Sequence, residues 1–144
     1  MKIIESSDNP IEILKNDKKE NSLSLYYFTA SWCGPCQRIF PSLLDLENKL
    51  KEQYNKLEEE TSSDESTDLS DTDSEDLDVK INPLRKVIFY KIDINENDEY
   101  SDSLNIKSVP TFHLYDGEEL LGQTTGANIQ KIGELITNNI KIKK

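Results

Sequence analysis

Runs of apolar residues separated by polar stretches predict the strands of this chain. Three runs rich in β-branched and aromatic residues predict buried strands, at residues 23–29 (LSLYYFT), 87–94 (VIFYKIDI) and 111–115 (TFHLY). A short apolar pair near the start, Ile3 and Ile4, predicts an edge strand. Asp116-Gly117 is a turn signal after the third run, so residues 119–124 are predicted to return as a neighbouring strand.

Apolar residues at helical spacing predict helices between these strands. A polar cap at residues 7–9 followed by Pro10 predicts a helix over residues 10–16. After Cys36, a stripe at spacings of three and four predicts a long helix, kinked at Pro41, with the apolar members Ile39, Leu43, Leu46, Leu50, Tyr54 and Leu57. Two further helices are predicted over residues 97–104 and 129–140. This order of elements is typical of an α/β domain with a central mixed sheet of four to five strands flanked by helices.

The charge of the chain is concentrated in one segment. Among 144 residues there are 28 acidic and 17 basic ones, and residues 58–78 contain eleven of the acids and no Lys or Arg. Without that segment, acids and bases balance at 17 each. Because it has little to bury and repels itself, we expect residues 58–82 to form a disordered insertion within a single domain, 1–144, with residues 58–60 extending the preceding helix. It is interpreted either as a solvated insert or as a segment that recruits a basic partner.

Composition also excludes several classes of protein. The N-terminal sequence has no signal-peptide or transit-peptide pattern, and no window approaches the ~18 apolar residues of a membrane span. Two cysteines form at most one bridge, which excludes a disulfide-stapled secreted scaffold. We therefore expect a cytoplasmic protein with neither a membrane nor a nucleic-acid partner.

The two cysteines, Cys33 and Cys36, enclose Gly34 and Pro35 where a predicted strand passes into a helix. A zinc site needs four ligands, and this chain offers one such pair and a single histidine, His113. An iron–sulfur cluster shared by two copies of the chain, an inert buried pair and thiol–disulfide exchange are the other readings. We expect no bound metal, and the local geometry favours exchange.

Exchange chemistry needs one ionised thiol and a second thiol within reach. A helix that begins at the motif directs unpaired N–H groups and its positive dipole end toward Cys33, which favours the thiolate. Cys36 lies one helical turn later, Pro35 suits a first turn, and Gly34 leaves room for a substrate backbone. Cys33 is therefore predicted to attack a disulfide and Cys36 to resolve the mixed disulfide that results.

The stretch Trp32-Cys33-Gly34-Pro35-Cys36 resembles the active-site signature of the thioredoxin family. The resemblance covers roughly residues 1–55 and 84–144, and its other matching positions are Phe28, Ala30, Pro41, Lys91, Asp93, Val109-Pro110-Thr111, Gly117 and Gly126. It implies a thioredoxin fold and reduction of protein disulfides. It also implies electrons supplied from NADPH by a thioredoxin reductase, with no cofactor bound to this chain. The alternative is a thioredoxin-like binding or adaptor module with weak redox activity, which recruits partners through the acidic segment.

The resemblance further implies how the site is completed. Pro110 is expected to be cis and to lie beside the sulfurs, which leaves the backbone of Val109 free to pair with a substrate peptide. Trp32 is expected to form part of the docking surface. His113, three residues beyond Pro110, is expected to pack under a helix rather than act as a base.

Two positions depart from the family pattern. Tyr27 stands where thioredoxins usually carry a buried acid, which is thought to take the proton of the second cysteine and to pair with the lysine matched by Lys91. A phenol is a poor base at neutral pH, with a reference pKa near ~10, although a nearby ammonium would lower it. We therefore expect slower deprotonation of Cys36 than in typical relatives. Thr29 replaces a second Trp at the rim of the site.

Overall fold

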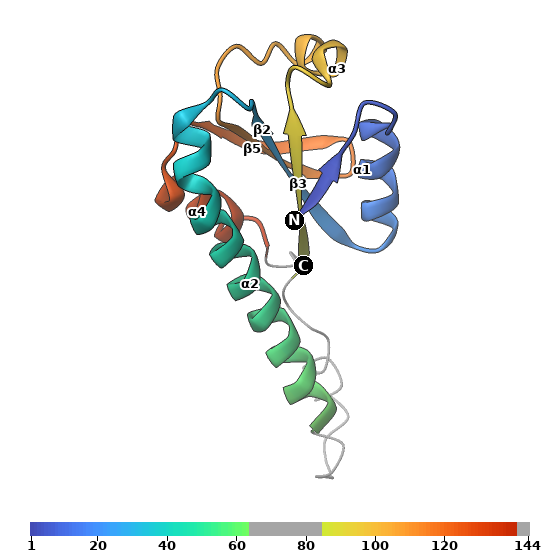
Figure 1. The fold of residues 1–144 in the computed structure, drawn as a ribbon. Coiled ribbons are helices and arrows are strands. Elements are labelled where there is room, and N and C mark those ends of the chain that lie inside the picture. Colours follow the sequence, from blue (N-terminus) through green and yellow to red (C-terminus); the bar gives the residue numbers. More distant parts are fainter. Residues whose placement is uncertain (64–84, 141–144) are drawn as a thin grey trace.

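The computed structural model describes residues 1–63 and 85–140 of the chain. Within them lie five strands and four helices (Figure 1). In chain order they are β1 (Lys2–Ile4), α1 (Pro10–Lys19), β2 (Ser22–Thr29), α2 (Gly34–Ser63), β3 (Lys86–Asp93), α3 (Asp98–Ser103), β4 (Thr111–Asp116), β5 (Glu119–Thr125) and α4 (Ile129–Thr137).

The strands form one mixed sheet in the order β1-β3-β2-β4-β5. β1 and β2 run parallel to β3, whereas β4 pairs antiparallel with β2 and with β5. In this register Tyr27 lies between Lys91 on one side and Phe112 on the other. The predicted mixed sheet flanked by helices is confirmed, and its centre is the strand that leads into the cysteine motif.

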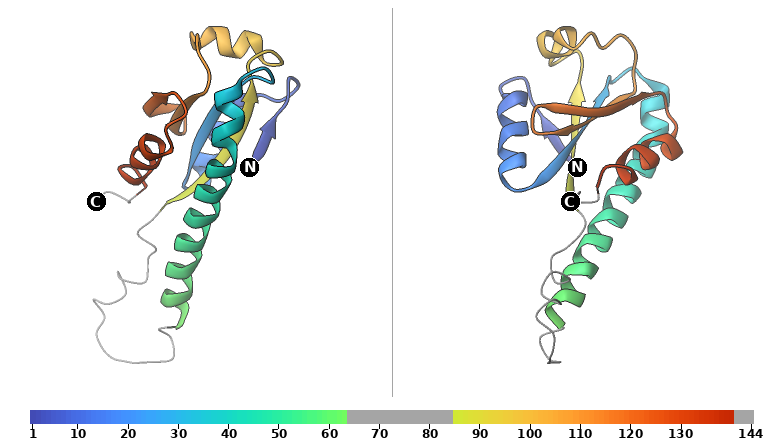
Figure 2. Two further views of the ribbon diagram at one scale, coloured as in Figure 1. Left: turned by 60° about the vertical axis from the view of Figure 1, so that its left-hand side comes forward. Right: turned by 180° about the vertical axis from the view of Figure 1, so that it is seen from behind.

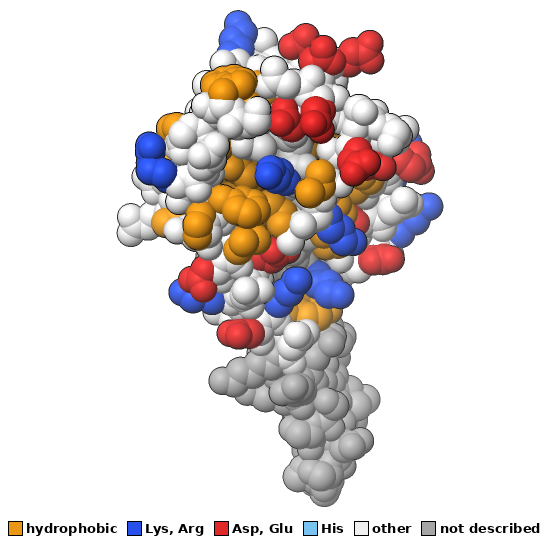
Figure 3. Space-filling view, viewed as in Figure 1, with side chains coloured by type: hydrophobic (Ala, Val, Ile, Leu, Met, Phe, Trp, Pro, Cys, Tyr) orange, Lys and Arg blue, Asp and Glu red, His pale blue; other side chains and the backbone are white. Residues whose placement is uncertain are grey.

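Helices cover both faces of the sheet (Figure 2). Because side chains alternate along a strand, odd-numbered residues of β2 such as Leu25 pack with α2 and α4, while even-numbered ones such as Phe28 pack with α1 and α3. All eight residues of β2 are buried for this reason. The surface over α2 and β3 carries acidic and basic side chains together, with hydrophobic side chains gathered at its middle (Figure 3).

Several helix boundaries differ from the sequence predictions, and α4 ends at Thr137 rather than at residue 140. α1 continues to Lys19, beyond the predicted end at residue 16. α2 passes through Pro41 and ends at Ser63, so it includes residues 58–60 of the acidic insertion, as predicted, and also residues 61–63, which were predicted to be disordered. Glutamate is a good helix former, and extending an existing helix costs far less than starting one. Residues 64–82 of that insertion lie outside the described part of the chain.

The chain re-enters the fold at Arg85, which is fixed at three points. Its backbone N–H donates to the carbonyl of Ile140 at 2.7 Å. Its guanidinium donates two hydrogen bonds to the carboxylate of Asp116, at 2.9 and 3.2 Å, and Lys18 donates a third at 3.1 Å. These bonds join α1, the start of β3 and the end of β4. No helix among the described residues is long and apolar enough to span a bilayer.

Candidate functional site

Cys33 and Cys36 are joined by a disulfide at the junction of β2 and α2. Their Cα atoms lie 5.3 Å apart, and the two side chains are only 3% and 1% exposed. The strand ends at Thr29 and the helix begins at Gly34, so the pair occupies the first turn of α2 and the residue before it. The sequence prediction placed the motif on this strand-to-helix turn.

A backbone amide of the first helical turn, that of Cys36, faces the sulfur of Cys33. The N–H of Cys36 lies 3.1 Å from that Sγ atom, while the carbonyl of Cys33 accepts from Gln37 at 3.2 Å. Such donors favour negative charge on the sulfur when the disulfide is opened. A Cβ placed on Gly34 would meet only the side chain of Arg38, at 3.6 Å, so space is free above the motif.

The loop before β4 reaches the same sulfur. The Val109–Pro110 peptide bond is cis, as the resemblance implies, and the carbonyl oxygen of Val109 lies 3.8 Å from Sγ of Cys33. The carbonyl of Pro110 accepts from the N–H of Gly126 at 2.8 Å, which fixes this loop to the chain beyond β5. Val109, Pro110 and Cys33 therefore come together although 76 residues separate the first and the last of them.

Trp32 is the most exposed large hydrophobic residue of the described chain, at 67%. Its indole N–H donates to the side-chain oxygen of Asn95 at 3.3 Å. The ring thus presents a wide apolar surface beside the cysteines while its polar edge is held in place. Asn95 was not among the residues singled out from the sequence, and only its place two residues after the end of β3 would have suggested it.

Tyr27 is buried in the core rather than turned to solvent. Its phenol donates a 3.0 Å hydrogen bond to the backbone carbonyl of Cys36. Its ring stacks on Phe112, with centroids 5.1 Å apart, and on Phe40 at 6.4 Å. Burial raises the pKa of Tyr27, although a hydrogen bond from Thr29 offsets part of that rise. The phenol therefore stays protonated at neutral pH, as expected of a poor base, and the ammonium of Lys91 is not among the causes that shift its pKa.

A cavity of about 340 Å³ lies between the start of α2 and the ends of β2 and β3. Its walls are Tyr27, Thr29, Ala30, Ser31, Cys36, Gln37, Phe40, Lys91 and Asp93. The ammonium of Lys91 lies 5.1 Å from the centroid of the Phe40 ring, and no carboxylate within the described chain pairs with it. The sequence suggested Lys91, whereas the cavity depends on packing that no local pattern encodes.

His113 lies on the opposite face of the sheet from the sulfurs, because it packs against Phe28 whereas the cysteines belong to the core cluster on the other face. Its ring packs edge-on against Phe28, and its Nδ1 atom shares a 3.0 Å hydrogen bond with the hydroxyl of Tyr115. Burial lowers its pKa. The prediction that His113 packs under a helix rather than facing the thiols is confirmed.

Metal ligands are not grouped in the described parts of the chain. No cluster of three or more His, Cys, Asp or Glu side chains lies within reach of one ion there. The arrangement around the sulfurs instead combines a disulfide between neighbouring cysteines, a backbone N–H facing one sulfur and an exposed aromatic surface. That combination is suited to exchange with a disulfide presented by another molecule.

Comparisons with known proteins give a consistent result. The family model described as Thioredoxin matches residues 6–138. A thioredoxin of Geodia cydonium is 32% identical over 113 residues, covering 78% of this chain and 74% of that protein. A mitochondrial thioredoxin O1 of Arabidopsis thaliana is 25% identical over 136 residues, which cover 93% of this chain and 53% of that protein. The crystal structure of Chlamydomonas reinhardtii thioredoxin f2 superposes with a TM-score of 0.67 at 25% identity, over 99% of each chain.

Proposed function

Because the chain belongs to the thioredoxin family and is a thiol–disulfide oxidoreductase, we propose that it reduces disulfide bonds in other proteins. The observation that supports this most strongly is the disulfide at the start of α2, with the amide of Cys36 facing the sulfur of Cys33. A cysteine in that position is stabilised as a thiolate when reduced, and the thiolate is the attacking species.

The cycle proceeds through two exchanges. The thiolate of Cys33 attacks a substrate disulfide, forming a bond to one substrate sulfur and releasing the other as a thiolate that takes up a proton from solvent. Cys36 then loses its proton and attacks the sulfur of Cys33. This closes the Cys33–Cys36 disulfide and releases the remaining substrate sulfur as a second thiol, so two electrons have passed to the substrate.

Substrate docking is assigned to the surface around the sulfurs. Trp32 offers an exposed aromatic ring, and the backbone of Val109 next to Pro110 offers hydrogen-bonding groups to an extended peptide. Gly34 leaves room for that peptide to approach.

Electrons are proposed to return to the disulfide from NADPH through a thioredoxin reductase or an equivalent donor. This chain would then bind no cofactor of its own and would meet its reductase as a protein partner. Reductase-coupled reduction of insulin, followed by NADPH consumption, tests both claims together. Cys33→Ser should abolish turnover, whereas Cys36→Ser should allow one attack and then trap a mixed disulfide with insulin. A wild-type chain that consumes no NADPH with any reductase and leaves insulin oxidised would contradict the proposal.

A binding module with weak redox activity remains the second candidate. Two observations favour it: the missing buried acid at Tyr27 and the eleven acidic residues between positions 58 and 78, which suit a basic partner. A deletion of residues 60–80 separates the candidates. Loss of capture of basic proteins with unchanged insulin reduction would support a recruiting role, and unchanged capture would favour a solvated insert.

We propose a cytoplasmic location, since a dithiol that works as a reductant needs a reducing compartment. The similarity to a mitochondrial thioredoxin makes the mitochondrion the alternative. A full-length chain carrying a C-terminal fluorescent protein, imaged against a mitochondrial marker, distinguishes the two.

A further inference from the structure

Resolution of the mixed disulfide requires that Cys36 lose a proton, and Tyr27 is not suited to take it. Its phenol is the donor in the bond to the carbonyl of Cys36, so its own proton is already committed. The pKa of Tyr27 is raised by burial, which keeps the hydroxyl neutral. Another group near Cys36 is therefore needed as the acceptor.

The cavity beside Cys36 contains one carboxylate, that of Asp93. Asp93 ends β3 directly opposite Thr29 of β2 and lies two residues after Lys91, so both charged side chains emerge on the same face of the strand. One carboxylate oxygen, Oδ1, accepts from the N–H of Asn95 at 2.8 Å. The other oxygen has no protein partner among the described residues, and Lys91 is not within ion-pair distance.

The cavity also provides a path between the two groups. Its volume of about 340 Å³ exceeds the ~30 Å³ share of a water molecule in the liquid several times over. The hydroxyls of Thr29 and Tyr27 and the side chain of Gln37 offer polar groups along its wall. The small side chain of Thr29 leaves this volume open next to Cys36.

We propose that Asp93 accepts, through water in this cavity, the proton that Cys36 gives up when it resolves a mixed disulfide. The proposal rests on the proposed reductase cycle. The Cys36 S–H bond breaks, its proton passes by way of water to the Asp93 carboxylate, and the freed sulfur bonds to Sγ of Cys33. The bond between Cys33 and the substrate breaks, the substrate sulfur leaves as a thiolate, and Asp93 later returns the proton to solvent. Asp93 thus acts on Cys36 through water rather than by direct contact.

Several other groups influence the same proton. On the elements packed against Cys36, the titratable or charged side chains that share its cavity are Tyr27 on β2 and Lys91 and Asp93 on β3, and Cys33 precedes it in the motif. The ammonium of Lys91 favours a thiolate at Cys36. The charge of Asp93 alone would disfavour one, since like charges repel. A purely electrostatic role and a proton-accepting role for Asp93 therefore predict opposite effects when its charge is removed.

A two-phase exchange reaction isolates the step. Reduced protein mixed with one equivalent of 5,5′-dithiobis(2-nitrobenzoate) releases one thionitrobenzoate when Cys33 attacks, and a second when Cys36 resolves the adduct. Asp93→Asn keeps an oxygen for the Asn95 N–H but removes the base. It should slow the second release at neutral pH by between about 10-fold and about 100-fold. The larger of these values is the smallest effect that is typical of a directly positioned base. The pH midpoint of the second phase should rise, while the first phase stays unchanged.

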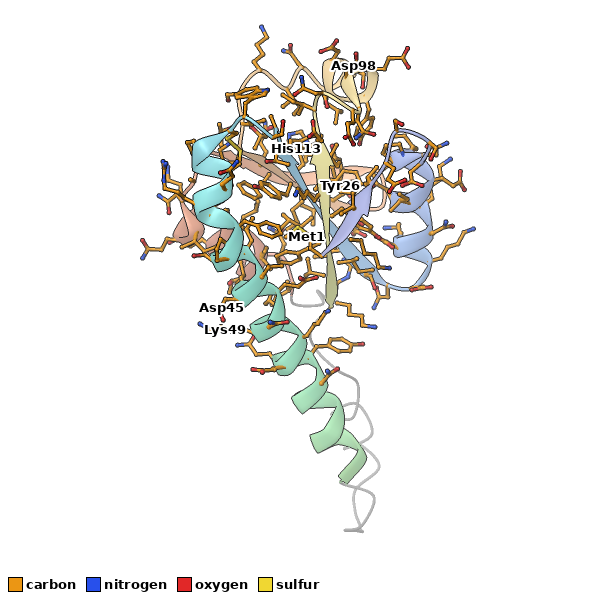
Figure 4. The ribbon with its side chains drawn as sticks, in the orientation of Figure 1. Met1, Tyr26, Asp45, Lys49, Asp98 and His113 are labelled. Atoms are coloured by element: carbon orange, nitrogen blue, oxygen red, sulfur yellow. A yellow bond between two sulfur atoms is a disulfide. The ribbon has the colours of Figure 1, made fainter. Side chains whose placement is uncertain are left out.

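Two variants complete the test. Asp93→Glu restores a carboxylate and should recover much of the second-phase rate. Asp98→Asn removes an exposed acid of α3 at the same end of the molecule, outside the cavity, and should change neither phase (Figure 4). A second release in Asp93→Asn that is as fast as, or faster than, wild type overturns the role of Asp93. A wild-type protein that never makes the second release overturns the dithiol cycle itself.

Discussion

The phenol of Tyr27 donates a 3.0 Å hydrogen bond to the backbone carbonyl of Cys36, and so ties the central strand β2 to the first turn of α2. A position that resembles the site of a catalytic acid in thioredoxins is occupied here by a structural donor. The stacking of its ring on Phe112 fixes that donor against the sheet. The site thus gains rigidity at the position where it lacks a base.

Replacing Tyr27 by Asp should speed the reduction of insulin in the reductase-coupled assay. A carboxylate at this position is a far better proton acceptor than a phenol, and it would act without the intervening cavity water. The change also removes a buried aromatic ring, so we expect a loss of about 3–5 kcal/mol in the free energy of unfolding. Denaturant unfolding should accompany the rate measurement.

Tyr27→Phe is the matched control for that experiment. It keeps the ring and its stacking but removes the hydrogen bond from the phenol to the carbonyl of Cys36, at a cost of about 0.5–1.5 kcal/mol. It should not reproduce any gain in rate seen with Asp. An Asp variant that folds and reduces insulin no faster than wild type would show that loss of a proton from Cys36 does not limit turnover.

Trp32→Ala should weaken reduction of protein disulfides more than reduction of a small disulfide. The exposed indole supplies apolar contact area to a bound protein, and we expect kcat/KM for insulin to fall about 10-fold. Ile3→Ala serves as the control, because Ile3 is 64% exposed against 67% for Trp32 but lies on the edge strand β1. Equal losses in the two variants, or no loss with Trp32→Ala, would remove Trp32 from the docking surface.

Asp116→Asn should lower stability in a pH-dependent way. Hydrogen bonds from Arg85, with a further contribution from Lys18, hold the pKa of Asp116 below its ordinary value. The stabilisation is therefore present above about pH 4 and disappears as the pH falls through the lowered folded-state pKa. We expect a loss of about 2 kcal/mol at pH 7, measured by urea unfolding, that shrinks toward zero at acidic pH.

Asp45→Asn is the comparison for that variant. Asp45 and Lys49 form an exposed pair on α2, 3.2 Å apart with side chains 66% and 68% exposed (Figure 4). Such pairs contribute no more than about 0.5 kcal/mol. If Asp116→Asn lowers the free energy of unfolding at pH 7 by no more than Asp45→Asn does, the hydrogen bonds from Arg85 to Asp116 stabilise the fold no more than an exposed ion pair.

His113 should make the fold less stable in mild acid. Burial lowers its pKa, so below about pH 6.5 the unfolded chain binds a proton that the folded chain does not. It is the only histidine in the chain, which makes the effect assignable. The variant His113→Phe should lack this contribution of the histidine to the pH dependence of the free energy of unfolding. As the pH falls, the free energy of unfolding of the variant should therefore rise relative to that of wild type, by up to about 1.4 kcal/mol per pH unit. Parallel pH profiles for the two proteins would contradict this.

The fold was largely predictable because its signals are local. The apolar runs at residues 23–29 and 87–94 identified the two central strands, and both predictions lie within one residue of the observed bounds. The end of α2 was harder, since a run of acids is compatible with both a helix and a disordered segment. There the preceding helix decided the outcome for residues 58–63.

The site was predictable only in part. Cys33 and Cys36 stand out by their spacing. Val109 lies near them because β2 pairs with β4, and its proximity was predictable only from the resemblance to a known family. The donor role of Tyr27 toward Cys36, and the cavity shared with Asp93, depend on how helix and sheet pack together. Such packing has no signature in a single sequence.

The acidic segment leaves the described fold at Ser63 and the chain returns at Arg85, at the pole of the molecule remote from the sulfurs (Figure 1). Because Arg85 is anchored independently, residues can be added or exchanged between these two positions without moving the first turn of α2. This junction is therefore a suitable place to graft an epitope or a fluorescent reporter.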